Sequence, residues 1–130
     1  MRAVDTNVLV RLLVNDDPVQ AAAAHQAMAA EPVFVPKTVV LELEWVLRSV
    51  YQRSSSAVAI AIEGLLAAED ISVEDAVAVK RALAWFKEGL DLADALHLAS
   101  SSHADGFLTF DVALRRRAVD MGARPPVAAP

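Results

Sequence analysis

Apolar segments of two lengths alternate along the chain. Runs of three or four residues bounded by polar residues or proline predict strands, and longer segments with apolar positions at helical spacing predict helices. The predicted strands cover residues 2–4, 33–35, 71–73 and 107–110. The predicted helices cover residues 7–14, 18–30, 38–53, 57–68, 75–88, 91–102 and 111–121. Asp17, Thr38 and Asp75 are predicted N-caps of the helices that start there, and Gly122 is the predicted C-cap of the last helix.

This alternation predicts an α/β fold, a three-layer sandwich in which a mainly parallel central sheet of four to five strands is flanked by helices. A length of 130 residues is typical of one domain, and no linker interrupts the pattern. We therefore expect a single domain over residues 1–122. Residues 123–130 include Pro125, Pro126 and Pro130, and we expect them to form a mobile C-terminal tail.

Composition narrows the possible functions. The chain is 55% hydrophobic, as expected of a globular core, and it has no cysteine, which excludes a disulfide framework, a thiolate zinc site and a cysteine nucleophile. No apolar run has the length of a membrane span, and nothing resembles a signal peptide, so we expect a soluble cytoplasmic protein. The net charge of −5 argues against a broad nucleic-acid-binding surface, although metal ions could still meet phosphates on an acidic nuclease.

Glu42 and Glu44 belong to the same predicted helix but differ in their neighbours. Glu44 has Arg48 four residues on, the favourable orientation for a surface ion pair. Glu42 has no cation three or four residues away and lies on the edge of an apolar stripe, where an unpaired charge is costly. The stripe consists of Val39, Leu43, Val46, Leu47 and Val50. Glu42 is therefore either a rim residue that extends to water or part of a functional site.

Asp91 and Asp94 stand three residues apart at the start of a predicted helix. Both positions are favoured by the helix dipole, and Asp91 suits an N-cap. A cap needs only one carboxylate, however, and Asp94 begins an otherwise apolar helix with Leu98 four residues on. Asp94 is therefore the second candidate for a functional role.

Asp5 and Asp111 each follow a predicted strand directly and open a predicted helix. Helix capping would explain either residue alone. In open parallel sheets, however, ligands bind beyond the carboxyl ends of the strands, where two such acids could converge. Together with Glu42 and Asp94 they would form a group of four carboxylates, which is tolerable only when protonated or neutralised by cations. Oxygen ligands favour Mg²⁺ or Mn²⁺ over zinc, and such ions promote attack on a phosphate.

Four sequence motifs, which follow one another in a fixed order, make the chain similar to a known family of proteins. They are D-T-N after the first strand, V-L-E-L-E-W-V-L-R, D-L-A-D-A-L-H-L-A, and L-T-F-D before the final helix. In this order and spacing the chain resembles the PIN-domain nucleases, and among them the VapC-type ribonuclease toxins of prokaryotic toxin–antitoxin pairs. The likeness extends from Ala3 to about Met121.

The resemblance implies a PIN-like fold and a metal-dependent endoribonuclease that acts as the toxin of a type II toxin–antitoxin system. Asp5, Glu42, Asp94 and Asp111 would be the catalytic acids and would hold one or two Mg²⁺ or Mn²⁺ ions. Asn7 and Thr109 would be supporting polar residues. The implied partners are an RNA substrate, a second copy of the chain in a homodimer, and an antitoxin whose C-terminal segment covers the site. Hydrolysis would leave a 5′-phosphate and a 3′-hydroxyl.

Basic residues and histidines are candidates for direct roles in binding RNA and in catalysis. Arg11, Arg115 and Arg116 are possible contacts to the RNA backbone, and the alternative for each is a solvated helix face. No residues suggest the histidine pair of a metal-independent ribonuclease. His25 lies in the alanine-rich helix, His97 is flanked by leucines and His103 is at a helix end, so each is predicted to be structural or exposed.

Two other classes remain open. A phosphatase-like or receiver-like phosphotransfer domain would also use Mg²⁺ and an aspartate at the position of Asp5. The phosphatase class needs D-x-D, however, and Asn7 stands in place of the second aspartate, while a receiver domain needs an acidic pair near the N-terminus and a late lysine. A non-enzymatic interaction module would leave Glu42 and Asp94 without a purpose.

Overall fold

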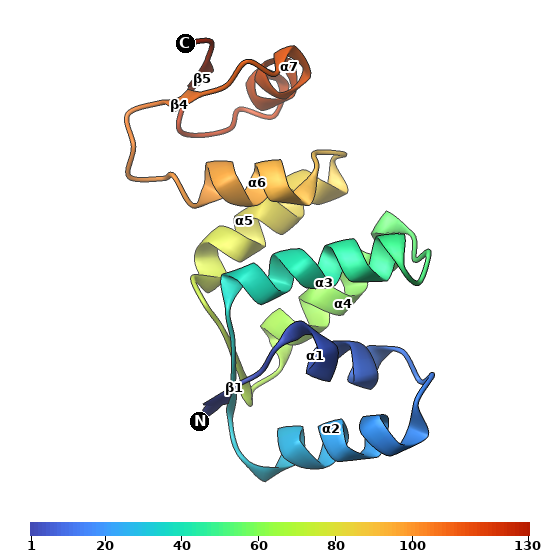
Figure 1. Cartoon of the computed structure of the whole chain (residues 1–130). Coiled ribbons are helices and arrows are strands. Elements are labelled where there is room, and N and C mark those ends of the chain that lie inside the picture. Colours follow the sequence, from blue (N-terminus) through green and yellow to red (C-terminus); the bar gives the residue numbers. More distant parts are fainter. The chain divides into compact units, whose positions relative to one another are not determined.

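The computed structural model describes residues 1–130 (Figure 1). The strands are β1 (Arg2–Ala3), β2 (Val33–Val35), β3 (Ile71–Val73), β4 (Phe107–Leu108) and β5 (Val127–Ala128). The helices are α1 (Thr6–Leu13), α2 (Pro18–Ala30), α3 (Lys37–Ser49), α4 (Ser55–Ala67), α5 (Ala76–Lys87), α6 (Leu92–Ala99) and α7 (Val112–Asp120). The chain divides into two compact units, Met1–Ala76 and Val77–Pro130, which are described separately.

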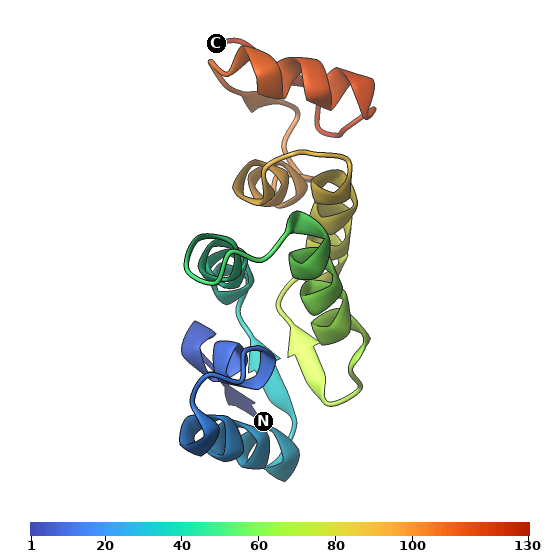
Figure 2. The same ribbon diagram turned by 90° about the vertical axis from the view of Figure 1, so that its right-hand side faces the viewer.

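In the first unit, three parallel strands form a sheet in the order β1-β2-β3. Val33 and Val35 of the central strand point to the same face of the sheet and are buried there, whereas Phe34 between them is partly exposed. Helix α1 packs against α2 and α3, and α4 packs against α3 and β3, an arrangement visible in Figure 2. Burial of apolar side chains such as Leu9 and Ile62 stabilises this packing.

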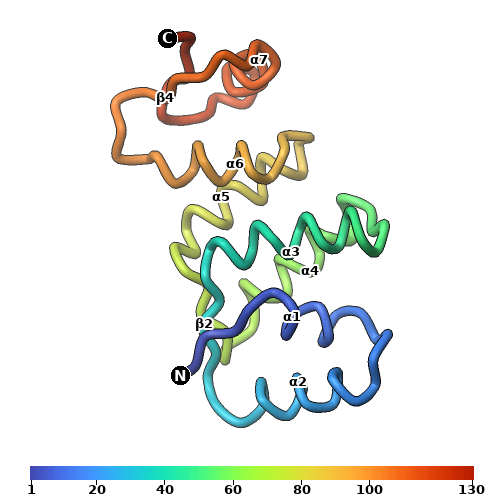
Figure 3. The backbone as a smooth tube through the Cα atoms, viewed as in Figure 1, coloured from blue at the N-terminus to red at the C-terminus, as the bar shows by residue number.

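In the second unit, β4 and β5 form a parallel pair beside α7, and the chain can be followed through it in Figure 3. Phe107 pairs with Val127 and Leu108 pairs with Ala128. The strand β5 lies within residues 123–130, for which the sequence predicts a mobile tail. Its backbone is held by hydrogen bonds from Phe107 N to Pro126 O and from Thr109 N to Ala128 O, at 2.9 and 3.0 Å.

The predicted class, a mixed α/β fold with parallel pairing, is confirmed. The sequence predicts one sheet of four to five strands, but the five strands form two sheets. One sheet contains β1, β2 and β3, and the other contains β4 and β5. The partner of β4 comes from the proline-rich residues 123–130, for which the sequence predicts a tail and not a strand. No helix combines the length and the apolar character that a membrane crossing requires.

One predicted helix cap is wrong, because α3 begins one residue earlier than the sequence predicts. Helix α3 begins at Lys37 with Pro36 as its N-cap and no side-chain cap, so Thr38 lies inside the first turn. Pro36 has the extended conformation of a cap residue, and its carbonyl accepts from the N–H groups of Val39 and Val40. Asp75 directly precedes α5 with φ of 49°, and its carboxylate pairs with Lys37 at 3.1 Å.

Candidate functional site

Asp5 occupies the turn between β1 and α1. It is the N-cap of α1, where its Oδ1 accepts a hydrogen bond from the N–H of Val8 at 3.3 Å. Its side chain is exposed, and Oδ2 takes no part in the cap. Asp5 therefore caps α1, as the sequence allows, and its second carboxylate oxygen stays outside the cap.

Glu42 lies on α3 with an exposed side chain, and its partner comes from α1. The hydroxyl of Thr6 donates a hydrogen bond to Glu42 Oε1, and Thr6 itself is only 3% exposed. Since Thr6 follows Asp5 directly, this bond places the Glu42 carboxylate at the start of α1, beyond the carboxyl end of β1. Sequence reasoning found no partner for Glu42 because it considered only the neighbours on its own helix.

Glu44 is the buried acid of α3, which corrects the prediction of a surface pair. Arg48 Nε donates to Glu44 Oε1 at 2.7 Å, as the spacing predicts, but Glu44 is only 3% exposed. The face of α3 that enters the core contains Val40, Leu43, Glu44 and Leu47. Val50, assigned to the apolar stripe, is 54% exposed. The spacing of Val40 and Leu47 could have shown that Glu44 shares their face.

Asp94 lies half-buried in the first turn of α6, and the pKa of its carboxyl is raised. Asp91 is the N-cap of this helix, and its Oδ2 accepts from the N–H of Asp94 at 3.3 Å. Burial raises the pKa of the Asp94 carboxyl, the negative charges of Asp91 and Asp111 raise it further, and only His97 acts against them. Asp94 is therefore close to two other carboxylates and is not the cap.

Asp111 opens α7 after β4, and Thr109 supports the turn that presents it. Asp111 Oδ1 accepts from the N–H of Leu114 at 3.0 Å, so Asp111 is the N-cap. Thr109 Oγ1 accepts from the N–H of Asp111 at 3.1 Å, and the Thr109 carbonyl accepts from Arg115 Nη1 at 2.9 Å. The hydroxyl of Thr109 therefore stabilises the backbone at Asp111, and the hydrogen bond from Arg115 links α7 to the same turn.

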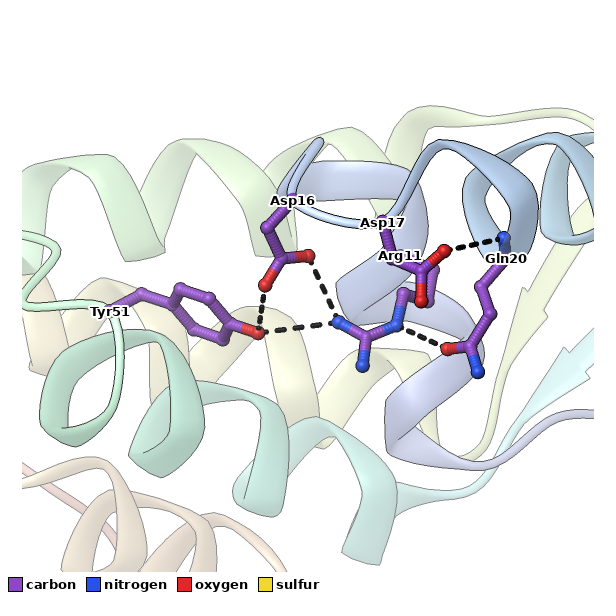
Figure 4. A network of polar contacts seen from close by, with 5 residues as sticks. All are labelled: Arg11, Asp16, Asp17, Gln20 and Tyr51. Carbon is purple, nitrogen blue, oxygen red and sulfur yellow. Dashed lines mark hydrogen bonds and ion pairs between the residues drawn. The ribbon is translucent and has the colours of Figure 1, made fainter.

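Arg11 is the centre of a polar network at the far end of α1 (Figure 4). It donates from Nε to Gln20 Oε1 at 2.6 Å and from Nη1 to Asp16 Oδ1 at 3.0 Å and to the Tyr51 hydroxyl at 3.4 Å. Tyr51 in turn donates to Asp16 Oδ2 at 2.9 Å. The bond to Tyr51, followed by the charges of Asp16 and Asp17, raises the pKa of Arg11. Of its guanidinium nitrogens, Nη2 takes no part in this network.

The three consecutive arginines of α7 have different surroundings. Arg115 is bound to the Thr109 carbonyl, and Arg117 Nη1 donates to the carbonyl of Gly89 at 2.6 Å. Arg116 is exposed and enters no hydrogen bond or ion pair in the structure. Among these arginines, Arg116 is the one with a guanidinium fully available to a phosphate.

A groove of about 280 Å³ lies between α1 and α2, and its lining begins at Asn7, two residues after Asp5 in the sequence. Its walls are mainly apolar, and Asn7 and Arg11 stand on its α1 side. The lining residues are Asn7, Val8, Arg11, Gln20, Ala23, Ala24 and Ala27. Asn7 is exposed at this groove, and its amide is hydrogen-bonded to neither Asp5 nor Glu42, the two candidate acids of the first unit.

The predicted acids are thus found as two pairs, each within one unit. Thr6 holds Glu42 next to Asp5 in the first unit, and Asp94 and Asp111 lie within electrostatic range of each other in the second. Neither unit by itself gathers three His, Cys, Asp or Glu side chains that could hold a metal ion. The donor atoms are carboxylate oxygens, and the charge around Asp94 is not neutralised by a neighbouring lysine or arginine. These properties fit a hard divalent cation such as Mg²⁺ or Mn²⁺.

Comparison with known proteins supports the family expected from the four motifs. The model of the PIN-domain family matches residues 2–120, almost the whole length of the sequence. No curated protein matches the chain. PIN domains are generally nucleases that depend on divalent metal ions, so the match implies a hydrolase with nuclease-type chemistry.

Proposed function

Because the chain belongs to the PIN-domain family, we propose that it is a Mg²⁺- or Mn²⁺-dependent endoribonuclease of the VapC type, the toxin of a type II toxin–antitoxin pair. The main support for a metal-dependent nuclease is the electrostatic environment of Asp94. Its carboxyl is partly buried and lies within electrostatic range of two further aspartates, and a carboxylate in such surroundings gains from a bound cation.

The proposed metal ligands are Asp5, Glu42, Asp94 and Asp111. Asp5 and Asp111 each use one carboxylate oxygen to cap a helix and keep the other oxygen outside that bond. Capping fixes the side chain of each aspartate, so its second oxygen has a defined direction. The divalent ion, when bound, would activate water and stabilise negative charge on the phosphate.

Other residues of the chain would hold the RNA and shape the site. Arg116 would bind the RNA backbone through its available guanidinium, and Arg11 could do so only through Nη2. Arg115 and Thr109 would hold the turn that presents Asp111. Asn7, exposed beside Asp5, would contact the substrate or the metal's water shell. We further propose that the protein works in the cytoplasm as a homodimer and is silenced by an antitoxin protein.

A cleavage assay tests the nuclease proposal. Wild type, Asp5→Asn and Asp94→Asn are incubated with a structured RNA containing single-stranded loops, in Mn²⁺ or in EDTA. Glu69→Gln and Asp120→Asn, both exposed and without ion pairs, are the matched controls in the two units. We expect cleavage by the wild type and the controls in Mn²⁺, with 5′-phosphate products, and a loss of about 100-fold or more in the two site variants.

Equal cleavage by wild type and Asp5→Asn, or cleavage in EDTA, would contradict a carboxylate metal site. Cleavage of single-stranded DNA in preference to RNA would contradict the ribonuclease assignment. Phosphorylation of Asp5 by a small phosphodonor would favour the receiver-like or phosphatase-like alternative. The toxin role is tested by induced expression in a bacterial host, where wild type should arrest growth and Asp94→Asn should not.

A further inference from the structure

Thr6 is unusual among the buried side chains of this protein. Only two polar or charged residues are buried, Thr6 and Glu44, and Glu44 bonds to Arg48 on its own helix. Thr6 instead reaches from α1 to Glu42 on α3. A buried hydroxyl is costly unless it is hydrogen-bonded, and an apolar side chain of the same shape would fill the position without that cost. The hydroxyl therefore needs a reason other than packing.

The direction of the hydrogen bond indicates that reason. An ionised carboxylate can only accept, so the Thr6 hydroxyl donates to Glu42 Oε1. Oε2 of Glu42 stays outside this bond, on a side chain that is otherwise exposed. A free glutamate on a helix surface samples many rotamers, and the bond to Thr6 selects those that direct the carboxylate toward the start of α1.

Thr6 is also tied to Asp5 through the backbone. It is the first residue of α1, and Asp5 caps that same turn by accepting from Val8. One helical turn therefore sets the position of both carboxylates, Asp5 by its own cap and Glu42 through the Thr6 hydroxyl. Ligands that are held before a metal arrives lose less conformational freedom when it binds.

We propose that Thr6 is a positioning residue, which orients the Glu42 carboxylate so that it can take part in binding the divalent ion. The role rests on the proposed metal-dependent function, and it is assigned to the hydroxyl of Thr6 rather than to its methyl group. Residues that hydrogen-bond to metal ligands without touching the metal typically contribute 10- to 100-fold in metal affinity.

The decisive comparison is between Thr6→Val, which keeps the shape and loses the hydroxyl, and Thr6→Ser, which keeps the hydroxyl and loses the methyl group. Thr38→Val is the matched control, because Thr38 is exposed in the first turn of α3 and makes no side-chain hydrogen bond. Mn²⁺ binding is measured directly by electron paramagnetic resonance of the free ion, and RNA cleavage is measured over a range of Mn²⁺ concentrations.

We expect Thr6→Val to bind Mn²⁺ about 10-fold more weakly and to need correspondingly more Mn²⁺ for half-maximal cleavage. At saturating Mn²⁺ its kcat should recover to nearly that of the wild type, and its Tm should differ little. Thr6→Ser and Thr38→Val should behave as the wild type. In the background of Glu42→Ala, Thr6→Val should cause no additional loss, because the hydroxyl acts through Glu42.

Several outcomes would overturn the positioning role. These are wild-type Mn²⁺ affinity in Thr6→Val, equal losses in Thr6→Val and Thr6→Ser, or a full loss by Thr6→Val when Glu42 is already alanine. If Thr6→Val does not fold, Thr6→Ala, which suits a helix, provides the same comparison. Wild-type protein that binds Mn²⁺ but cleaves no RNA would contradict the nuclease function alone, and the affinity of Thr6→Val would still decide the role of Thr6. Wild-type protein that binds no Mn²⁺ would contradict both.

Discussion

Asp94 of α6 and Asp111 of α7 lie within electrostatic range of each other in the second unit. Partial burial raises the pKa of Asp94 most, and the charges of Asp91 and Asp111 raise it further. Three aspartates in one neighbourhood, opposed only by His97, make this part of the metal-free protein less stable than a neutral equivalent would be. The same repulsion would favour a bound divalent cation.

Asp94→Asn should stabilise the protein while it abolishes activity. The amide keeps the shape of the carboxyl group but removes its charge, so the repulsion from Asp91 and Asp111 disappears. In metal-free buffer we expect Tm to rise by a few degrees at neutral pH, while RNA cleavage in Mn²⁺ falls by about 100-fold or more. Differential scanning fluorimetry measures the first effect, with Asp120→Asn as the control. A lower Tm for Asp94→Asn than for Asp120→Asn would contradict the repulsion.

The gain from Asp94→Asn should depend on pH with a definite sign. Because the pKa of Asp94 is raised on folding, the folded state binds more protons through the carboxyl range, and stability falls as pH rises through that range. Below the pKa of the unfolded chain, Asp94 is protonated in both states and the penalty vanishes. The Tm difference between variant and wild type should therefore be near zero at about pH 3 and grow toward pH 7. A difference that is constant over this range would be inconsistent with titration of Asp94.

Tyr51→Phe should destabilise the first unit without affecting metal binding. The substitution removes the hydroxyl that accepts from Arg11 and donates to Asp16, and the ring is retained. Hydrogen bonds in a partly exposed network contribute little each, so we expect a loss of about 1 kcal/mol or less. Urea denaturation measures the loss, and Arg53→Lys, at an exposed arginine outside the network, is the control. Mn²⁺ affinity should be unchanged, and a change would connect the network to the metal site.

Arg116→Gln should weaken RNA binding without loss of stability. The Arg116 guanidinium is exposed and unengaged, whereas Arg117 is held by the carbonyl of Gly89. A single phosphate contact contributes about 0.7 to the slope of log affinity against log salt concentration for a single strand. We expect the slope for Arg116→Gln to fall by about this amount with Tm unchanged, measured by fluorescence anisotropy in Ca²⁺ to limit cleavage. Arg81→Gln, exposed on α5, should match the wild type, and an unchanged slope in Arg116→Gln would rule out this contact.

Much of the local structure could be predicted from the sequence, because the signals are contained in a few neighbouring residues. The helix that begins at Pro18 with Asp17 as its cap is an example, since Asp17 accepts from the N–H of Gln20 at 3.0 Å. The strand Val33–Val35 and the left-handed Gly122 after α7 were likewise evident from local chemistry. The positions of Asp5 and Asp111 at strand ends followed from the same patterns.

The environments of these residues were decided only by the tertiary structure, because they depend on segments distant in the chain. The partner of Glu42 is Thr6, which lies on another helix, and no spacing within α3 points to it. The burial of Glu44 depends on which face of α3 meets the core. By itself the sequence determined where the acids stand along the chain and that they lack local cations. The tertiary structure decided that Glu42 accepts a hydrogen bond from the Thr6 hydroxyl and that Asp94 lies near the negative charge of Asp111. Such side-chain contacts form only when distant segments pack together.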